Sequence, residues 1–117
     1  MTAGIQTIIY PVRDLSAAKE RFLTILGQEP AVDQAYYVGW HIGSQDIGLD
    51  PNGHSKGMTG PVAYCHVDDI SAAVKALAAE GATIVQDVSA VGRGKLIATV
   101  SDPDGNVIGL LQEESGS

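Results

Sequence analysis

The chain has 117 residues, which is enough for one domain that buries its own core without metal ions or disulfides. Its 7 basic and 14 acidic residues give a net charge of −7, which argues against nucleic acids and anionic membranes as partners, because both require clustered Lys or Arg. A single cysteine, Cys65, excludes an internal disulfide and, without a signal-peptide pattern or a membrane-length apolar run, indicates a cytoplasmic protein.

The first half of the chain predicts the element order β-α-β-β-β. A β-branched run indicates a strand over Ile5–Val12. Apolar side chains at helical spacing then indicate a helix that is capped by Asp14 or Ser16 and ended by Gly27. The three further strands of this half are expected at Ala35–Val38, Trp40–Ile42 and Asp46–Leu49, with breaks at Gly39 and at Gly43-Ser44.

The second half predicts the same order after a linker at residues 51–61, whose three glycines indicate flexibility. A strand is expected over Val62–Val67, and an apolar stripe from Ile70 to Ala78 indicates a helix ended by Gly81. The remaining strands are expected at Thr83–Val88, Lys95–Val100 and Val107–Leu111. The Asp-Pro-Asp-Gly-Asn sequence at residues 102–106 favours a tight turn between the last two.

The two halves also repeat each other in sequence. VRDLSAA at residues 12–18 returns as VDDISAA at residues 67–73, and Ile47-Gly48-Leu49 returns as Ile108-Gly109-Leu110. A repeat in which residues 12–18 correspond to residues 67–73 is typical of two copies of one supersecondary unit.

Side-chain alternation gives each predicted sheet a face for its helix and an opposite face. We expect Ile8, Ile47 and Cys65, with their alternate neighbours, to lie toward the helices. The opposite faces should enclose a concave space, and the residues expected there are Thr7, Asp46, Gly48, Asp50, Val62, Tyr64, His66 and Gly109.

Three segments, VRDLSAAKERFLTILG, VDDISAAVKALAAEGA and SDPDGNVIGLLQ, resemble the vicinal oxygen chelate superfamily, which contains glyoxalase I, extradiol dioxygenases and bleomycin-binding proteins. The resemblance covers residues 5–112 and implies an α+β fold of two tandem βαβββ modules whose mixed sheets curl around a shared cavity. It implies a single domain over residues 1–117, with modules at about 5–50 and 62–112, and a homodimer.

Metal-dependent members of this superfamily place one His or Glu ligand in the first and last strand of each module. Carried over to this chain, the four points hold Thr7, Gly48, Val62 and Gly109, and none of these supplies a good metal ligand. The resemblance therefore implies a protein without metal, cofactor or catalytic residues. We expect it to bind a small and partly aromatic molecule, such as an antibiotic or a metabolite, without transforming it.

Several residues are candidates for contact with that ligand, and each has a structural alternative. Glycine at positions 48 and 109 would leave room for a flat ligand, or would merely relieve crowding between strands. Trp40 would stack on a planar ligand or belong to the core. Arg93 would reach an anionic group from a glycine-rich hairpin. The predicted ligand-binding residues are Thr7, Tyr37, Trp40, His41, Asp46, Gly48, Tyr64, His66 and Gly109.

Other functions stay open at this point. A metal-dependent lyase, isomerase or dioxygenase would need non-standard ligands, drawn from His41, Asp46, Asp50 and His66. A metal-free enzyme could use Tyr64 or His66 as acid or base, and a regulatory subunit could fill the cavity with its own side chains.

Overall fold

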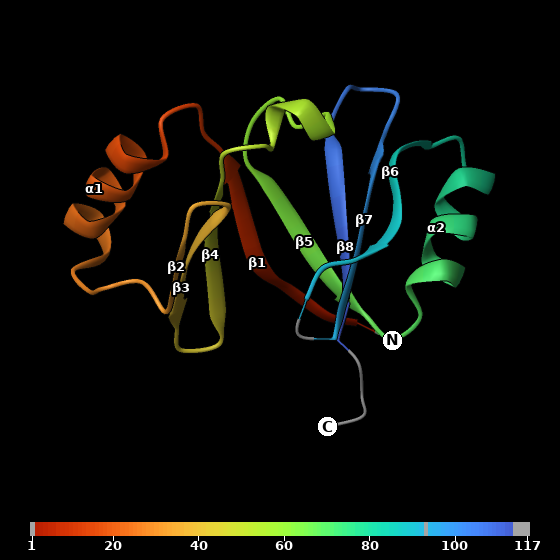
Figure 1. Cartoon of the computed structure of the whole chain (residues 1–117). Coiled ribbons are helices and arrows are strands. Elements are labelled where there is room, and N and C mark those ends of the chain that lie inside the picture. Colours follow the sequence, from red (N-terminus) through yellow and green to blue (C-terminus); the bar gives the residue numbers. More distant parts are fainter. Residues whose placement is uncertain (1, 93, 114–117) are drawn as a thin grey trace. The chain divides into compact units, whose positions relative to one another are not determined.

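The computed structural model describes residues 2–92 and 94–113 and contains two copies of one β-α-β-β-β arrangement (Figure 1). The first copy comprises β1 (Thr2–Pro11), α1 (Leu15–Leu26), β2 (Val32–Gln34), β3 (Tyr37–Ile42) and β4 (Gln45–Asp50). The second comprises β5 (Val62–Val67), α2 (Ile70–Ala79), β6 (Thr83–Ala90), β7 (Lys95–Ser101) and β8 (Val107–Glu113). The predicted α+β fold of two βαβββ modules is confirmed.

By its internal contacts the chain divides into two compact units. Thr7–Pro61 forms the first unit, and the second joins the described residues of 62–117 to those of 1–6. Strand β1 contributes to both units. In the second unit, Thr2 Oγ1 donates a 2.7 Å hydrogen bond to the carbonyl of His66. None of the helices in the described part of the chain is long and apolar enough to cross a membrane.

The first unit has the strand order β2-β3-β4-β1, in which only the β1–β4 pair is parallel. The register sets Gly48 of β4 between Ile9 of β1 and Gly39 of β3. Helix α1 covers one face of this sheet. The core beneath it contains the buried residues Ala18, Val38, Trp40 and Leu49.

The second unit places β5, β8, β7 and β6 in that order, and β5 pairs with β8 in parallel, with Tyr64 opposite Gly109. The core under α2 contains the buried residues Ile70, Val74, Ala98 and Leu110. Cys65 and Val67 of β5 pack against this core, whereas Val62, Tyr64 and His66 alternate with them on the other side. The predicted division of strand faces is therefore confirmed here.

Both helices begin at equivalent aspartates of the repeat. Asp14 Oδ1 accepts a 3.0 Å hydrogen bond from the backbone N–H of Ala17, and Asp69 Oδ1 accepts one of 3.0 Å from Ala72. Gly27 ends α1 with φ of 70°, a left-handed conformation that glycine adopts without a steric penalty.

Three predictions about the connections are wrong or incomplete. The strand expected at Ala35–Val38 is instead β2 at Val32–Gln34, followed by a turn at residues 35–36, because a three-residue edge strand has too short a pattern to detect. Gly39 does not break β3, which continues to Ile42. The segment predicted to be a flexible linker contains a short 3₁₀ helix at His54–Lys56, and Met58 in it is buried.

Candidate functional site

In each unit we call the sheet face opposite the helix the far face. The main side chain on the far face of the first unit is Tyr37. Its ring lies over two glycines that are cross-strand partners, Gly39 and Gly48. A Cβ added to Gly39 would be 2.7 Å from Tyr37 Cε2, and one added to Gly48 would overlap the Tyr37 hydroxyl oxygen. The space that we expected at Gly48 for a flat ligand is therefore taken by the chain's own tyrosine.

The Tyr37 hydroxyl is oriented but not paired. It makes no hydrogen bond to another residue of the described chain. Among the described residues, every buried side-chain oxygen or nitrogen has a hydrogen-bond partner. Since the Tyr37 hydroxyl has none, it must be accessible to solvent. Burial of the ring, together with the carboxylates of Asp46 and Asp50, raises the pKa of Tyr37 to about 12. The phenol is therefore neutral at physiological pH and can donate a hydrogen bond.

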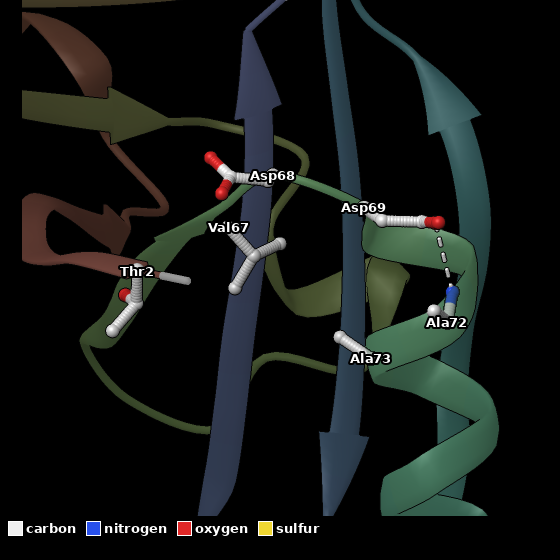
Figure 2. A pocket seen from close by; sticks show the side chains of 6 residues that line it. All are labelled: Thr2, Val67, Asp68, Asp69, Ala72 and Ala73. Carbon is white, nitrogen blue, oxygen red and sulfur yellow. Dashed lines mark hydrogen bonds between the residues drawn. The ribbon is translucent and has the colours of Figure 1, made fainter.

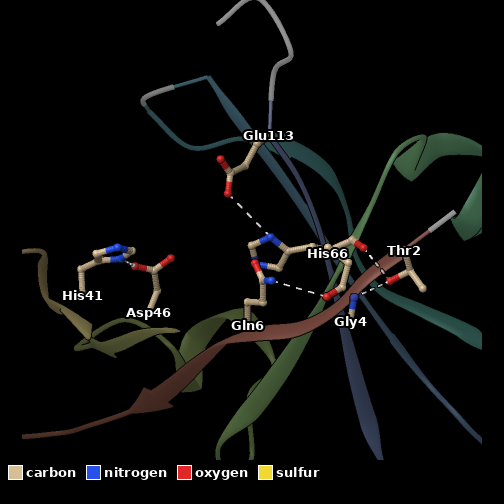
Figure 3. Close-up of polar contacts among 8 residues, drawn as sticks. Thr2, Gly4, Gln6, His41, Asp46, His66 and Glu113 are labelled. Atoms are coloured by element: carbon tan, nitrogen blue, oxygen red, sulfur yellow. Dashed lines mark hydrogen bonds and ion pairs between the residues drawn. The ribbon is translucent and has the colours of Figure 1, made fainter. Parts of the chain in front are cut away.

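The same far face carries a histidine–aspartate pair. His41 Nδ1 lies 2.7 Å from Asp46 Oδ1, and the His41 side chain is 60% exposed (Figure 3). Thr7 of β1 is opposite Asp46 in the sheet register and is buried. Asp50 is held in place locally, because Lys56 Nζ lies 2.8 Å from Oδ2 and the N–H of Asn52 donates to Oδ1.

The far face of the second unit is covered by Tyr64. The ring is buried, with 2% of the residue exposed, and a Cβ added to Gly109 would lie 2.6 Å from Tyr64 Cδ2. Gly109 thus accommodates Tyr64 as Gly48 accommodates Tyr37. Val62 is buried on the same side of β5.

His66 is buried at the end of β5 and faces a glutamate that the sequence analysis did not single out. Its Nδ1 lies 3.6 Å from Glu113 Oε1, and Thr2 contacts its carbonyl (Figure 3). The register of the β5–β8 pair is the feature from which the closeness of Glu113 to His66 could be foreseen. His66 is opposite Leu111, so a residue two positions further along β8 projects from the same face.

Trp40 belongs to the core. It is 1% exposed, packs against Phe22 of α1 at a ring-centroid distance of 6.0 Å, and donates from Nε1 to the carbonyl of Gln28 at 2.9 Å. Of the two alternatives for this tryptophan, the structure places it in the core. Arg93, the predicted contact for an anionic group, lies outside the described residues.

The side chains at the four family ligand points do not suit a divalent metal. Two of these points are glycines under tyrosine rings, a third is the aliphatic Val62, and Thr7 has a neutral hydroxyl. A Tyr37 ligand would have to be deprotonated, and its raised pKa opposes this.

A relocated site would need a third donor beside His41 and Asp46. Among residues 2–92 and 94–113, however, no three His, Cys, Asp or Glu side chains are grouped so that they could hold a metal ion.

Two shallow depressions lie beside the helices. One, of about 430 Å³, is at the start of α2 and is lined by Thr2, Val67, Asp68, Asp69, Ala72 and Ala73 (Figure 2). The other, of about 260 Å³, lies beside α1 and includes Lys19 and Asp33, whose Nζ and Oδ2 atoms are 2.6 Å apart. Within the described chain, neither is lined by any predicted ligand-binding residue. Neither depression therefore marks the predicted ligand-binding residues.

This fold, with its paired modules and equivalent far faces, is that of the Glyoxalase/Bleomycin resistance protein/Dioxygenase superfamily. The family profile matches residues 4–110, and the chain belongs to this superfamily. No curated protein matches the chain.

Solved structures share the fold at low sequence identity. A protein named as NAD-dependent benzaldehyde dehydrogenase from Legionella pneumophila has a TM-score of 0.72 and 12% identity, covering 92% of this chain and 98% of that one. Methylmalonyl-CoA epimerase from Mycobacterium tuberculosis has a TM-score of 0.68 and 18% identity, covering 97% and 89%. The Mn(II)-bound glyoxalase from Novosphingobium aromaticivorans has a TM-score of 0.68 and 19% identity, covering 96% and 39%. At such identities these three differently named proteins establish the fold and not the activity.

Proposed function

We propose that this chain is a metal-independent binding protein of the glyoxalase/bleomycin-resistance type, which holds a small antibiotic or metabolite without transforming it. One observation carries the proposal. Both last-strand points that bear metal ligands in metal-dependent relatives are glycines here, and each glycine lies under a tyrosine ring of the same chain. At Gly48 the ionic donor is thus replaced by the partly exposed ring of Tyr37, an aromatic surface that suits a planar ligand. At Gly109 the buried ring of Tyr64 fills the space.

We propose a binding surface on the far face of each unit, taken separately. In the first unit it includes Tyr37 and the His41–Asp46 pair. Gly48 lies under the Tyr37 ring, and Thr7 is opposite Asp46 in the sheet register. On the far face of the second unit, the residues predicted for this role are Tyr64, His66 and Gly109, and all three are buried in this structure. Trp40 would support this surface from the core and would not contact the ligand itself.

The experiment that tests the proposal combines metal analysis with recovery of the ligand. Protein purified without chelator or affinity-tag metal should contain far less than one transition metal ion per chain. A small-molecule screen should then find a ligand that binds saturably and is recovered unchanged. About one bound metal ion per chain, or conversion of the ligand, would instead favour the metal-dependent lyase, isomerase or dioxygenase.

We further propose that the protein is cytoplasmic and forms a homodimer. The single half-buried thiol of Cys65, which lies 3.1 Å from Thr2 Oγ1, is consistent with a reducing compartment. Light scattering coupled to size-exclusion chromatography would test the oligomeric state, and a mass of about 12.2 kDa would contradict the dimer.

A further inference from the structure

We propose that the Tyr37 hydroxyl is the group that orients the ligand, by donating a hydrogen bond to a carbonyl oxygen of an uncharged planar molecule. This inference rests on the proposed function, because it names a contact and a ligand class for that same surface. Tyr37 would thus take over, with a neutral hydrogen bond, the positioning that a metal ion provides in metal-dependent relatives.

The geometry of the ring is the first support. The ring of Tyr37 extends over the adjacent glycines 39 and 48, so that its hydroxyl lies where a side chain at position 48 would begin. The absence of side chains at these two glycines leaves space for the ring in this position. A donor that is already held in place loses little conformational entropy when a ligand binds, so its hydrogen bond contributes more to affinity.

The state of the hydroxyl is the second support, and Tyr64 provides the contrast. Tyr64 also covers a glycine, but it is 2% exposed and already has a further interaction within the chain. Tyr37 is only partly buried, and its hydroxyl is accessible and has no hydrogen-bond partner among the described residues. Tyr64 therefore fills space, whereas Tyr37 offers a donor to a ligand.

The surrounding charges define the class of ligand. Asp46 and Asp50 act electrostatically on Tyr37, and they disfavour a bound carboxylate or phosphate as they disfavour a phenolate. Asp50 is compensated by Lys56, and Asp46 is hydrogen-bonded by His41. With both carboxylates engaged, the Tyr37 hydroxyl offers a neutral donor on this face. Its best partner is a neutral acceptor such as the carbonyl of a lactone, amide or quinone.

The test uses two planar bicyclic probes of similar size, coumarin, which has a lactone carbonyl, and naphthalene, which has no acceptor. Dissociation constants are measured by NMR titration of the wild-type chain, of Tyr37→Phe and of Tyr36→Phe. Tyr36 is the matched control, because it is the adjacent tyrosine and is 67% exposed in a turn. Phenylalanine keeps the ring and removes only the hydroxyl.

We expect Tyr37→Phe to weaken coumarin binding by roughly 3- to 10-fold, the usual effect of losing one hydrogen bond, and to leave naphthalene binding unchanged. Tyr36→Phe should change neither. If the wild type binds coumarin and Tyr37→Phe has no effect, or weakens both probes equally, the role of the hydroxyl is wrong while the proposed function stands. If the wild type binds neither probe saturably, the inferred ligand class is wrong, whereas the proposed function fails only if the metal analysis or the ligand screen contradicts it.

Discussion

Gly48 is the residue at which the fold and the proposed site depend on each other most directly. A Cβ at this position would overlap the Tyr37 hydroxyl, so we expect Gly48→Ala to push the ring out of its place. Overpacking of this kind costs about 1–3 kcal/mol of unfolding free energy. Urea unfolding followed by circular dichroism would measure the loss.

The control for this prediction is another glycine in a different environment. Gly60 has nothing within 4 Å of an added Cβ and has no left-handed backbone, so Gly60→Ala should leave the stability almost unchanged. In a Tyr37→Ala background, Gly48→Ala should also lose most of its effect, because the overlapping group is gone. An unchanged penalty in that background would show that the ring does not cause it.

Tyr37 also predicts a particular dependence of stability on alkaline pH. Burial and the two nearby aspartates raise the pKa of Tyr37 to about 12, above the value of about 10 of an unfolded tyrosine. Below pH 10 the phenol is protonated in both states and contributes no pH dependence. Between pH 10 and 12 the unfolded chain releases this proton more readily than the folded chain, so the stability should fall as the pH rises.

The variant Tyr37→Phe isolates this contribution. We expect the difference in unfolding free energy between wild type and variant to be constant up to about pH 9.5. Above pH 10 the wild type should lose stability more steeply than the variant. Absorbance at 295 nm, which reports tyrosinate, should lose its highest-pH step in the variant. Identical pH profiles would contradict the buried position of the ring.

At the level of elements, the sequence repeat makes a prediction about the two helices. Asp14 and Asp69 cap α1 and α2 with the same 3.0 Å hydrogen bond to the N–H three residues on. Alanine at either position should reduce the unfolding free energy by about 0.5–2 kcal/mol, and asparagine should restore most of it. Chemical denaturation of the four variants checks this. Asparagine variants as unstable as the alanine variants would show that the caps are not responsible.

The elements that sequence reasoning could predict are those with a repeated or periodic pattern. Asp14 and Asp69 locate the helices, and alternation assigns Cys65 and Tyr64 correctly to opposite faces of β5. The short strand β2 has only three residues and could not be detected in this way. Gly39 predicts a break when the sequence is considered alone. In the structure the strand continues through it, and the ring of Tyr37, two residues earlier in β3, covers it.

At the level of the whole molecule, the same limit applies to the candidate site. The positions of the four vacated ligand points follow from the family resemblance, since Thr7, Gly48, Val62 and Gly109 occupy matching strands in the two modules. What covers the two glycines depends on side chains from other strands, and spacing along the chain does not encode those contacts. The pairing of His66 with Glu113 is likewise a consequence of the β5–β8 register.

The proposed metal independence leads to a prediction about the stability of the chain. A protein that binds a metal ion only in its folded state gains stability from that ion. The neutral hydroxyl of Thr7 and the aliphatic side chain of Val62 should give this chain no comparable gain. We therefore expect excess EDTA, and added Mn²⁺, Ni²⁺ or Zn²⁺, to leave the thermal unfolding midpoint unchanged. A ligand found by screening should raise the midpoint, because at 100 times its dissociation constant it adds about 2.7 kcal/mol to the unfolding free energy. Differential scanning calorimetry measures both effects. A midpoint that falls with EDTA and recovers with one metal would show that a donor set other than the four family points is in use.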